Sequence, residues 1–202
     1  MIKNIILDFG DVLINLDKGA TARAMMAYGF TQVDPGLAEL FQAYEKGNMT
    51  TSEFLKRVSH QFPRVQVQDL ITAWNAILLD FPEHRLEFLE ELSGSEQYKL
   101  ILLSNTNALH MERVERQMGP ERFRRFRDAF DVFYLSHEMG MRKPDREIFE
   151  FVLQENGLTP QETFFVDDMP ENTLAASHLG IQVWNLQLGK EDITQLKSRL
   201  DP

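Results

Sequence analysis

The sequence predicts an α/β fold: a Rossmann-like, doubly wound parallel sheet that carries an inserted α-helical cap domain. Two observations predict it. Short apolar runs recur along the chain, each ending in polar residues and separated from the next by helical patterns, which is typical of βαβ units. One long stretch near the N-terminus has helical periodicity without a convincing strand, as expected of a helical insertion.

The expected strands are short runs rich in β-branched and aromatic residues. The first, Ile5 to Leu7, is apolar throughout, as a strand buried on both faces should be, and it leads into Asp8-Phe9-Gly10. Three runs repeat this pattern and a fourth, at 132–135, is weaker. In chain order the later strands are expected at 99–103, 132–135, 163–166 and 181–184.

Helical periodicity fills the segments between these strands. Residues 83–92 carry leucines at helical spacing, and residues 145–155 carry a second apolar stripe that stops at Asn156-Gly157. Pro160 then opens a brief helix before the next strand.

Residues 17–80 are predicted to form the helical cap. A capping-box pattern runs from Thr50 to Glu53, and Pro82 after Asp80-Phe81 marks the return to the core. The expected domains are therefore an α/β core made of residues 1–16 and 81–202, and a cap made of residues 17–80.

The polar residues that follow the strands are expected to meet. Ligands of open α/β sheets bind beyond the carboxyl ends of the strands. Asp8, Ser104, Asp167 and Asp168 should therefore converge on one site, with the cap above it.

Composition narrows the function classes. The 202-residue chain has a formal net charge of −10, which argues against sequence-independent nucleic-acid binding, and its arginine-rich stretch at 113–127 is interleaved with acidic residues as a solvated helix face would be. The absence of cysteine excludes disulfides and thiolate chemistry. The apolar run at the N-terminus lacks signal-peptide flanks and membrane-spanning length, so we expect a cytoplasmic protein without a membrane partner. We expect a monomer or a homodimer.

Four short motifs resemble those of the haloacid dehalogenase superfamily, in the order that this family has. They are Asp8-Phe9-Gly10-Asp11-Val12, Leu102-Leu103-Ser104-Asn105, Gly140-Met141-Arg142-Lys143-Pro144, and Asp167-Asp168 followed by Asn172. The resemblance implies that Asp8 is a nucleophile that takes up a phosphoryl group, that Lys143 neutralises it, and that Ser104 and Asn105 bind phosphate. It also implies Mg²⁺ held by Asp8, the Gly10 carbonyl, Asp167 and Asp168.

Gly10 departs from the family pattern, in which most phosphatases have a general acid/base aspartate at this position. General acid–base help is worth about 10²- to 10⁴-fold. A sugar 1-phosphate has a more acidic leaving group and depends less on that help. The surrounding motifs, Gly10 included, also resemble the branch of bacterial α-D-glucose-1-phosphate phosphatases.

The expected function is therefore a magnesium-dependent phosphatase of a small phosphorylated metabolite, with a sugar 1-phosphate favoured. Two alternatives stay open. Loss of the acid/base residue at Gly10 could leave a phosphometabolite-binding protein without turnover. A metal-independent 2-haloacid dehalogenase would use Asp8 on carbon, but would gain nothing from the Asp167-Asp168 pair.

Overall fold

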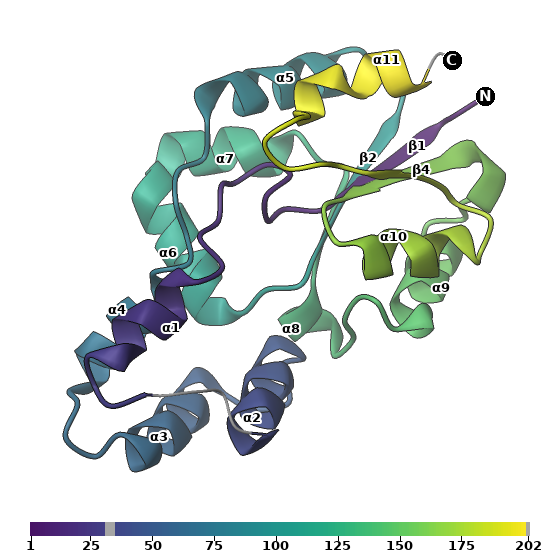
Figure 1. Ribbon diagram of the computed structural model, residues 1–202. Coiled ribbons are helices and arrows are strands. Elements are labelled where there is room, and N and C mark those ends of the chain that lie inside the picture. The colour runs from purple at the N-terminus through teal and green to yellow at the C-terminus, as the bar shows by residue number, and fades with distance from the viewer. Residues whose placement is uncertain (31–34, 201–202) are drawn as a thin grey trace.

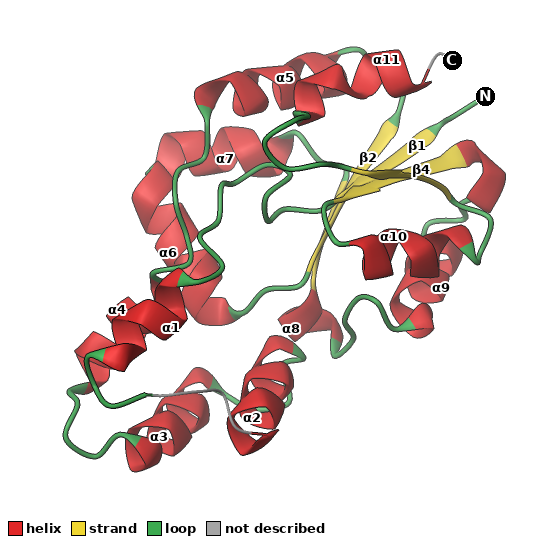
Figure 2. Cartoon of the chain, in the orientation of Figure 1, coloured by secondary structure: helices red, strands yellow, loops and turns green. Residues whose placement is uncertain are grey.

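A computed structural model of the protein describes residues 1–30 and 35–200. Within these residues a single parallel sheet of five strands is present, in the order β3-β2-β1-β4-β5. Figures 1 and 2 show its neighbouring strands β2, β1 and β4. The first strand lies at its centre, and Leu7 is level with Leu102 on one side and Val166 on the other. The strands are β1 (Asn4–Leu7), β2 (Lys99–Ser104), β3 (Val132–Leu135), β4 (Thr163–Asp167) and β5 (Gln182–Asn185).

All five expected strands are present, with ends shifted by one residue in several cases. The expected helix at Pro160 is a 3₁₀ turn, η1 (Pro160–Glu162). The remaining helices of the core are α5 (Glu83–Gly94), α6 (Ala108–Met118), α7 (Pro120–Asp128), α8 (Ser136–Met139), α9 (Arg146–Glu155), α10 (Pro170–Ser177), η2 (Ile193–Gln195) and α11 (Leu196–Leu200).

Both faces of the sheet are buried. Successive strand residues point to opposite faces, so each strand can contribute to an apolar cluster on either side. Ile5 and Leu7 belong to the apolar cluster that includes residues of α5, α6, α7 and α11. Ile6 belongs to a second cluster with residues of α9 and α10. The sheet is therefore doubly wound, as the sequence predicts, and Arg125 of α7 further links that helix to Glu83 and Glu90 of α5.

Four helices between β1 and α5 form a group of their own beyond one end of the sheet (Figure 1). They are α1 (Ala20–Met26), α2 (Pro35–Glu45), α3 (Thr51–Gln61) and α4 (Val67–Asn75). Their buried side chains pack in a separate cluster, in which the rings of Tyr44 and Phe54 stack at 4.1 Å between centroids. Thr50 caps α3 by accepting a hydrogen bond from the Glu53 amide. The cap limits of 17–80 stay a prediction.

The two connections between this helical group and the sheet run side by side. The Asn15 amide donates to the Asp80 carbonyl at 2.9 Å, and the Asp17 amide donates to the Ile77 carbonyl at 2.9 Å. A backbone bridge between Leu16 and Leu78 lies between them. Over the described residues, no helix combines the length and apolar character needed to cross a membrane.

Candidate active site

The polar residues predicted to meet do lie together at the carboxyl end of the sheet. Asp8 follows β1 directly, while Ser104 ends β2 and Asp167 ends β4. The parallel register holds these three strand ends level, and the Asp8 amide donates to the Val166 carbonyl at 2.9 Å. The fold therefore brings residues far apart in sequence into one buried cluster.

Lys143 lies at the centre of this cluster. Its Nζ is 2.6 Å from Asp8 Oδ1 and 2.7 Å from Asp167 Oδ2, and its side chain is only 1% exposed. Such a buried ammonium is stable only because both carboxylates neutralise it. Lys143, which was predicted to neutralise Asp8, thus lies in contact with it.

Asn105 holds the Lys143 backbone rather than the space above Asp8. Its Nδ2 donates to the Lys143 carbonyl at 2.8 Å, and its Oδ1 accepts from the Lys143 amide at 2.9 Å. Both ends of the side-chain amide are therefore occupied. Asn105 thus holds the Lys143 backbone in place, and its predicted contact with phosphate stays a prediction.

Asp167 is surrounded by donors from the protein. Besides Lys143, its oxygens accept from the Met169 amide at 2.8 Å and from Asn172 Nδ2, which is 3.0 Å from each. The residue is 0% exposed. These bonds engage both oxygens of Asp167.

Asp168 has fewer donors from the protein, although its side chain is only 5% exposed. Its carboxylate pairs with Lys18 Nζ at 2.5 Å, and that lysine also lies 3.1 Å from Asp11 Oδ2. Ligand atoms of Asp8, Asp167 and Asp168 all lie within 4.8 Å of one another. Three carboxylates so close are a donor set that suits a hard divalent cation such as Mg²⁺.

Burial sets the protonation behaviour of the cluster. It raises the pKa of Asp8 to about 7, against the opposing effect of Lys143 and with a further contribution from Asp167. Burial likewise raises the pKa of Asp168, although Lys18 opposes it. Burial would lower the pKa of Lys143, but Asp167 and Asp8 outweigh it and the net shift is upward. A bound cation would favour the ionised form of the acids.

The position of Gly10 is closed by an apolar side chain. A Cβ on Gly10 would lie 2.7 Å from Leu16 Cδ1 and 3.9 Å from Asp8 Oδ2. A side chain here would therefore approach the Asp8 carboxylate, as an acid/base residue must, and the flexible end of the Leu16 side chain would have to shift. The carbonyl of Gly10 is retained and can still serve a metal.

Asp11 does not replace the missing side chain. Its φ of 58° is in the left-handed region, so the backbone after Asp8 is not extended. One oxygen, Oδ1, accepts from the Leu16 amide at 2.9 Å while the other pairs with Lys18. Its carboxylate is thus engaged with the Leu16 backbone and with Lys18.

Ser104 is 2% exposed, and within residues 1–30 and 35–200 its hydroxyl has no hydrogen-bond partner. It is therefore free to donate to a ligand. The neighbouring Thr106 amide is taken, because it donates to Ser136 Oγ at 2.9 Å. Ser136 in turn reaches the Glu45 carbonyl of α2 at 2.7 Å, which ties the helical group to the site.

Sequence reasoning missed Lys18, Ser136 and Leu16. Lys18 precedes α1 and looks like any surface lysine, so no local pattern distinguishes it. Ser136 follows a strand end, which is the only sequence signal that could have singled it out.

Comparisons with known proteins place the chain in a family. The family model described as haloacid dehalogenase-like hydrolase matches residues 2–180. A curated relative, the D-ribitol-5-phosphate phosphatase of Bacteroides thetaiotaomicron, is 29% identical over 197 residues, which are 95% of this chain and 95% of that protein.

Solved structures agree with this match. A haloacid dehalogenase family enzyme of Bacteroides thetaiotaomicron in a magnesium complex has a TM-score of 0.87 and 36% identity, covering 97% of this chain and 98% of that one. A predicted hydrolase of the same family from Porphyromonas gingivalis has a TM-score of 0.86 and 30% identity, covering 100% and 99%. The fold class, the enzyme class and the resemblance drawn from the four motifs are confirmed, and the chain belongs to the haloacid dehalogenase-like hydrolase family.

Proposed function

We propose that the protein is a magnesium-dependent phosphomonoesterase in which Asp8 forms an aspartyl phosphate. The observation that carries the proposal is the contact of Lys143 Nζ with Asp8 Oδ1 at 2.6 Å, inside a cluster of three carboxylates. A buried cation beside a strand-end carboxylate is what an anionic substrate requires if that carboxylate is to attack it.

For the metal, we propose Asp8, the Gly10 carbonyl and Asp168 as protein ligands. Asp167 was also expected to be a ligand, but its donors favour a role in holding Lys143 and Asn172. Mg²⁺ bound there would neutralise phosphate charge and bridge the substrate to the protein. The magnesium complex of the related Bacteroides enzyme supports this choice of ion.

Asp8, Lys143 and Ser104 each have a separate role in the proposed reaction. An Asp8 oxygen attacks phosphorus, the new O–P bond forms, and the bond from phosphorus to the leaving oxygen breaks. The leaving oxygen takes a proton from solvent and departs as the alcohol. Lys143 and the Ser104 hydroxyl stabilise charge on the phosphoryl oxygens. Water then attacks the aspartyl phosphate, which releases inorganic phosphate and restores Asp8.

The substrate class is drawn from the relative and from the site. The curated relative is by name a D-ribitol-5-phosphate phosphatase, and a small phosphorylated metabolite is the corresponding proposal here. The narrower preference for a sugar 1-phosphate depends on Gly10, where the leaving oxygen lacks a proton donor. We also keep the cytoplasmic location and the monomeric or homodimeric state as predictions.

One observation favours the second candidate, a phosphometabolite-binding protein without turnover. Leu16 fills the space beside Gly10 in which an acid/base side chain would stand. Such a protein would bind Mg²⁺ and phosphate and release nothing. A haloacid dehalogenase is less well supported, since the L-2-haloacid dehalogenase to which the chain is similar shares 17% identity and shows the fold alone.

Phosphate release from a panel of phosphomonoesters, with Mg²⁺ and with a chelator, tests the proposal. We expect release that chelation abolishes and that Asp8→Asn removes. Asp69→Asn, on the exposed side of α4, is the matched control and should behave as the parent. Undiminished release by Asp8→Asn would refute the proposal, and binding without release would favour the second candidate.

A further inference from the structure

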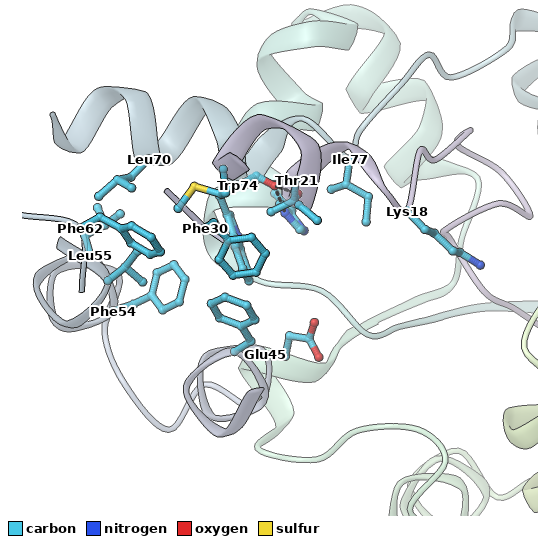
Figure 3. Close-up of a pocket in the computed structure, with 15 residues that line it drawn as sticks. Lys18, Thr21, Phe30, Glu45, Phe54, Leu55, Phe62, Leu70, Trp74 and Ile77 are labelled. Atoms are coloured by element: carbon cyan, nitrogen blue, oxygen red, sulfur yellow. Dashed lines mark hydrogen bonds between the residues drawn. The ribbon is translucent and has the colours of Figure 1, made fainter. Parts of the chain in front are cut away.

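The helical group surrounds a cavity whose lining includes Lys18, the residue that contacts Asp168 of the active site. Its volume is about 240 Å³, and its described lining comes from α1 to α4 and the residues beside them. Figure 3 shows Lys18 at one end and Phe54, Phe62 and Leu70 at the other. Because Lys18 Nζ contacts Asp168 at 2.5 Å, this end of the cavity is one ion pair away from the carboxylate cluster.

The far part of this cavity is apolar. Phe30, Phe54 and Trp74 present rings to it, and Leu55, Val58 and Leu70 line it further (Figure 3). Protein interiors leave few voids larger than a water molecule. A space of this size among short helices is therefore better explained as room for a ligand than as loose packing.

Polar side chains deep in the lining are already paired within the protein. Thr21 Oγ1 donates to the Trp74 carbonyl at 3.1 Å. His110 Nε2 donates to the same carbonyl at 3.2 Å, and His110 Nδ1 accepts from Asn107 Nδ2 at 3.1 Å. A polyol in this part would lose water and find no replacement partners, which is costly.

Glu45 is the acidic residue of the described lining and adds a charge constraint. Its carboxylate approaches Arg142 at 3.5 Å, which is an ion pair but not a hydrogen bond. It stands between the aromatic side chains and Lys18 (Figure 3). Its charge would repel a second phosphate or a carboxylate on the group that enters, while it could accept a hydrogen bond from one hydroxyl.

We infer that the leaving group of the substrate is an uncharged, mainly apolar chain or ring system of about ten non-hydrogen atoms, held in the cavity between Lys18 and Leu70. This rests on the proposed phosphatase function. The size follows by proportion: an apolar cavity of about 150 Å³ accommodates benzene, with six carbons, so 240 Å³ accommodates about ten. The inference departs from the sugar 1-phosphate preference, which is drawn from Gly10 and from the resemblance of the surrounding motifs.

A ladder of n-alkyl phosphates from ethyl to dodecyl, compared with glucose and ribitol phosphates, tests the inference. We expect kcat/KM to rise about fourfold per methylene, the ratio that corresponds to ~0.8 kcal/mol, and to level off near ten carbons. A chain of equal length with a terminal carboxylate should be a poor substrate. A flat ladder, or sugar phosphates better than octyl phosphate, would overturn the inference.

Ala22 and Ala27 supply a matched pair of variants on and beside α1. Ala22 lines the cavity, whereas Ala27 is exposed and outside it. Ala22→Leu fills space with three more carbons and should make the ladder level off about three carbons earlier. Ala27→Leu should leave the ladder as in the parent. Equal ladders for both variants would contradict the assignment of the cavity.

Binding separates this inference from the proposed function. In the Asp8→Asn protein, calorimetric titration with ethyl and decyl phosphate measures the same chain-length preference without turnover. If no ester is hydrolysed by the parent but decyl phosphate binds far more tightly than ethyl phosphate, the phosphatase proposal fails and the apolar site stands. If hydrolysis occurs and the two affinities are equal, the apolar site fails alone.

Discussion

His110 should make the stability of the protein depend on pH. The side chain lies where α6 meets α4: its ring stacks on Trp74 at 5.4 Å between centroids, and both ring nitrogens have partners. Burial lowers the pKa of His110 from 6.5 to about 4, against the hydrogen bond to the Trp74 carbonyl and with a small contribution from His137. The folded protein therefore keeps the ring neutral where the unfolded chain would protonate it.

The direction and size of this pH effect follow from the difference in proton binding between the folded and unfolded states. Between pH 6.5 and about 4 the unfolded state binds the proton and the folded state does not, so stability falls as pH falls through this window. With these two pKa values, the free energy of unfolding should drop by about 2 kcal/mol between pH 7.5 and pH 5, and by about 3 kcal/mol at the acid limit.

Urea unfolding of the parent and of His110→Gln at about pH 7.5 and pH 5 measures this contribution. The glutamine keeps a donor and an acceptor but does not titrate, so the variant should lose about 2 kcal/mol less than the parent on acidification. His60→Gln, at an exposed position of α3, should lose as much as the parent. Equal losses for His110→Gln and the parent would show that His110 does not cause the pH dependence.

Three further substitutions test the site. Asp168→Asn should raise the Mg²⁺ concentration for half-maximal activity at least about tenfold, whereas Asp167→Asn should mainly lower kcat; equal magnesium midpoints would contradict the proposed ligand set. Gly10→Asp alone should raise kcat for an alkyl phosphate only slightly. Combined with Leu16→Ala, which makes room for the new side chain, it should raise kcat by up to about 10²-fold. A comparable gain from Gly10→Asp alone would show that Leu16 does not block this position. Asn105→Ala removes two hydrogen bonds to the Lys143 backbone and should cost about 2 kcal/mol of stability in urea together with part of kcat, and parental values of both would exclude the positioning role.

The strands and the residues at their carboxyl ends were predictable, because a buried strand is recognised from its own residues. A strand buried on both faces must be apolar along its whole length, so Ile5 to Leu7 is visible as a strand without any knowledge of its neighbours. The polar residue after each strand then lies at the sheet edge by topology. This is why Asp8, Ser104 and Asp167 could be brought together from sequence.

Side-chain directions were not predictable, because they depend on contacts between distant segments. The left-handed backbone of Asp11 turns its carboxylate to Leu16 and Lys18, which no local pattern indicated. Asn105 pairs with Lys143 across 38 positions of sequence. The cavity within the helical group likewise arises from the packing of four helices, and their separate patterns only predicted that they exist.

The most direct test of the account is to trap the phosphorylated enzyme. Protein mixed with Mg²⁺ and a phosphomonoester is quenched in acid within the first turnover, and its peptides are analysed by mass spectrometry. We expect one phosphoryl group on Asp8 of the peptide that contains β1, and none when the metal is chelated. Phosphate released in the same experiment without any modified Asp8, or with the phosphoryl group on another residue, would contradict it.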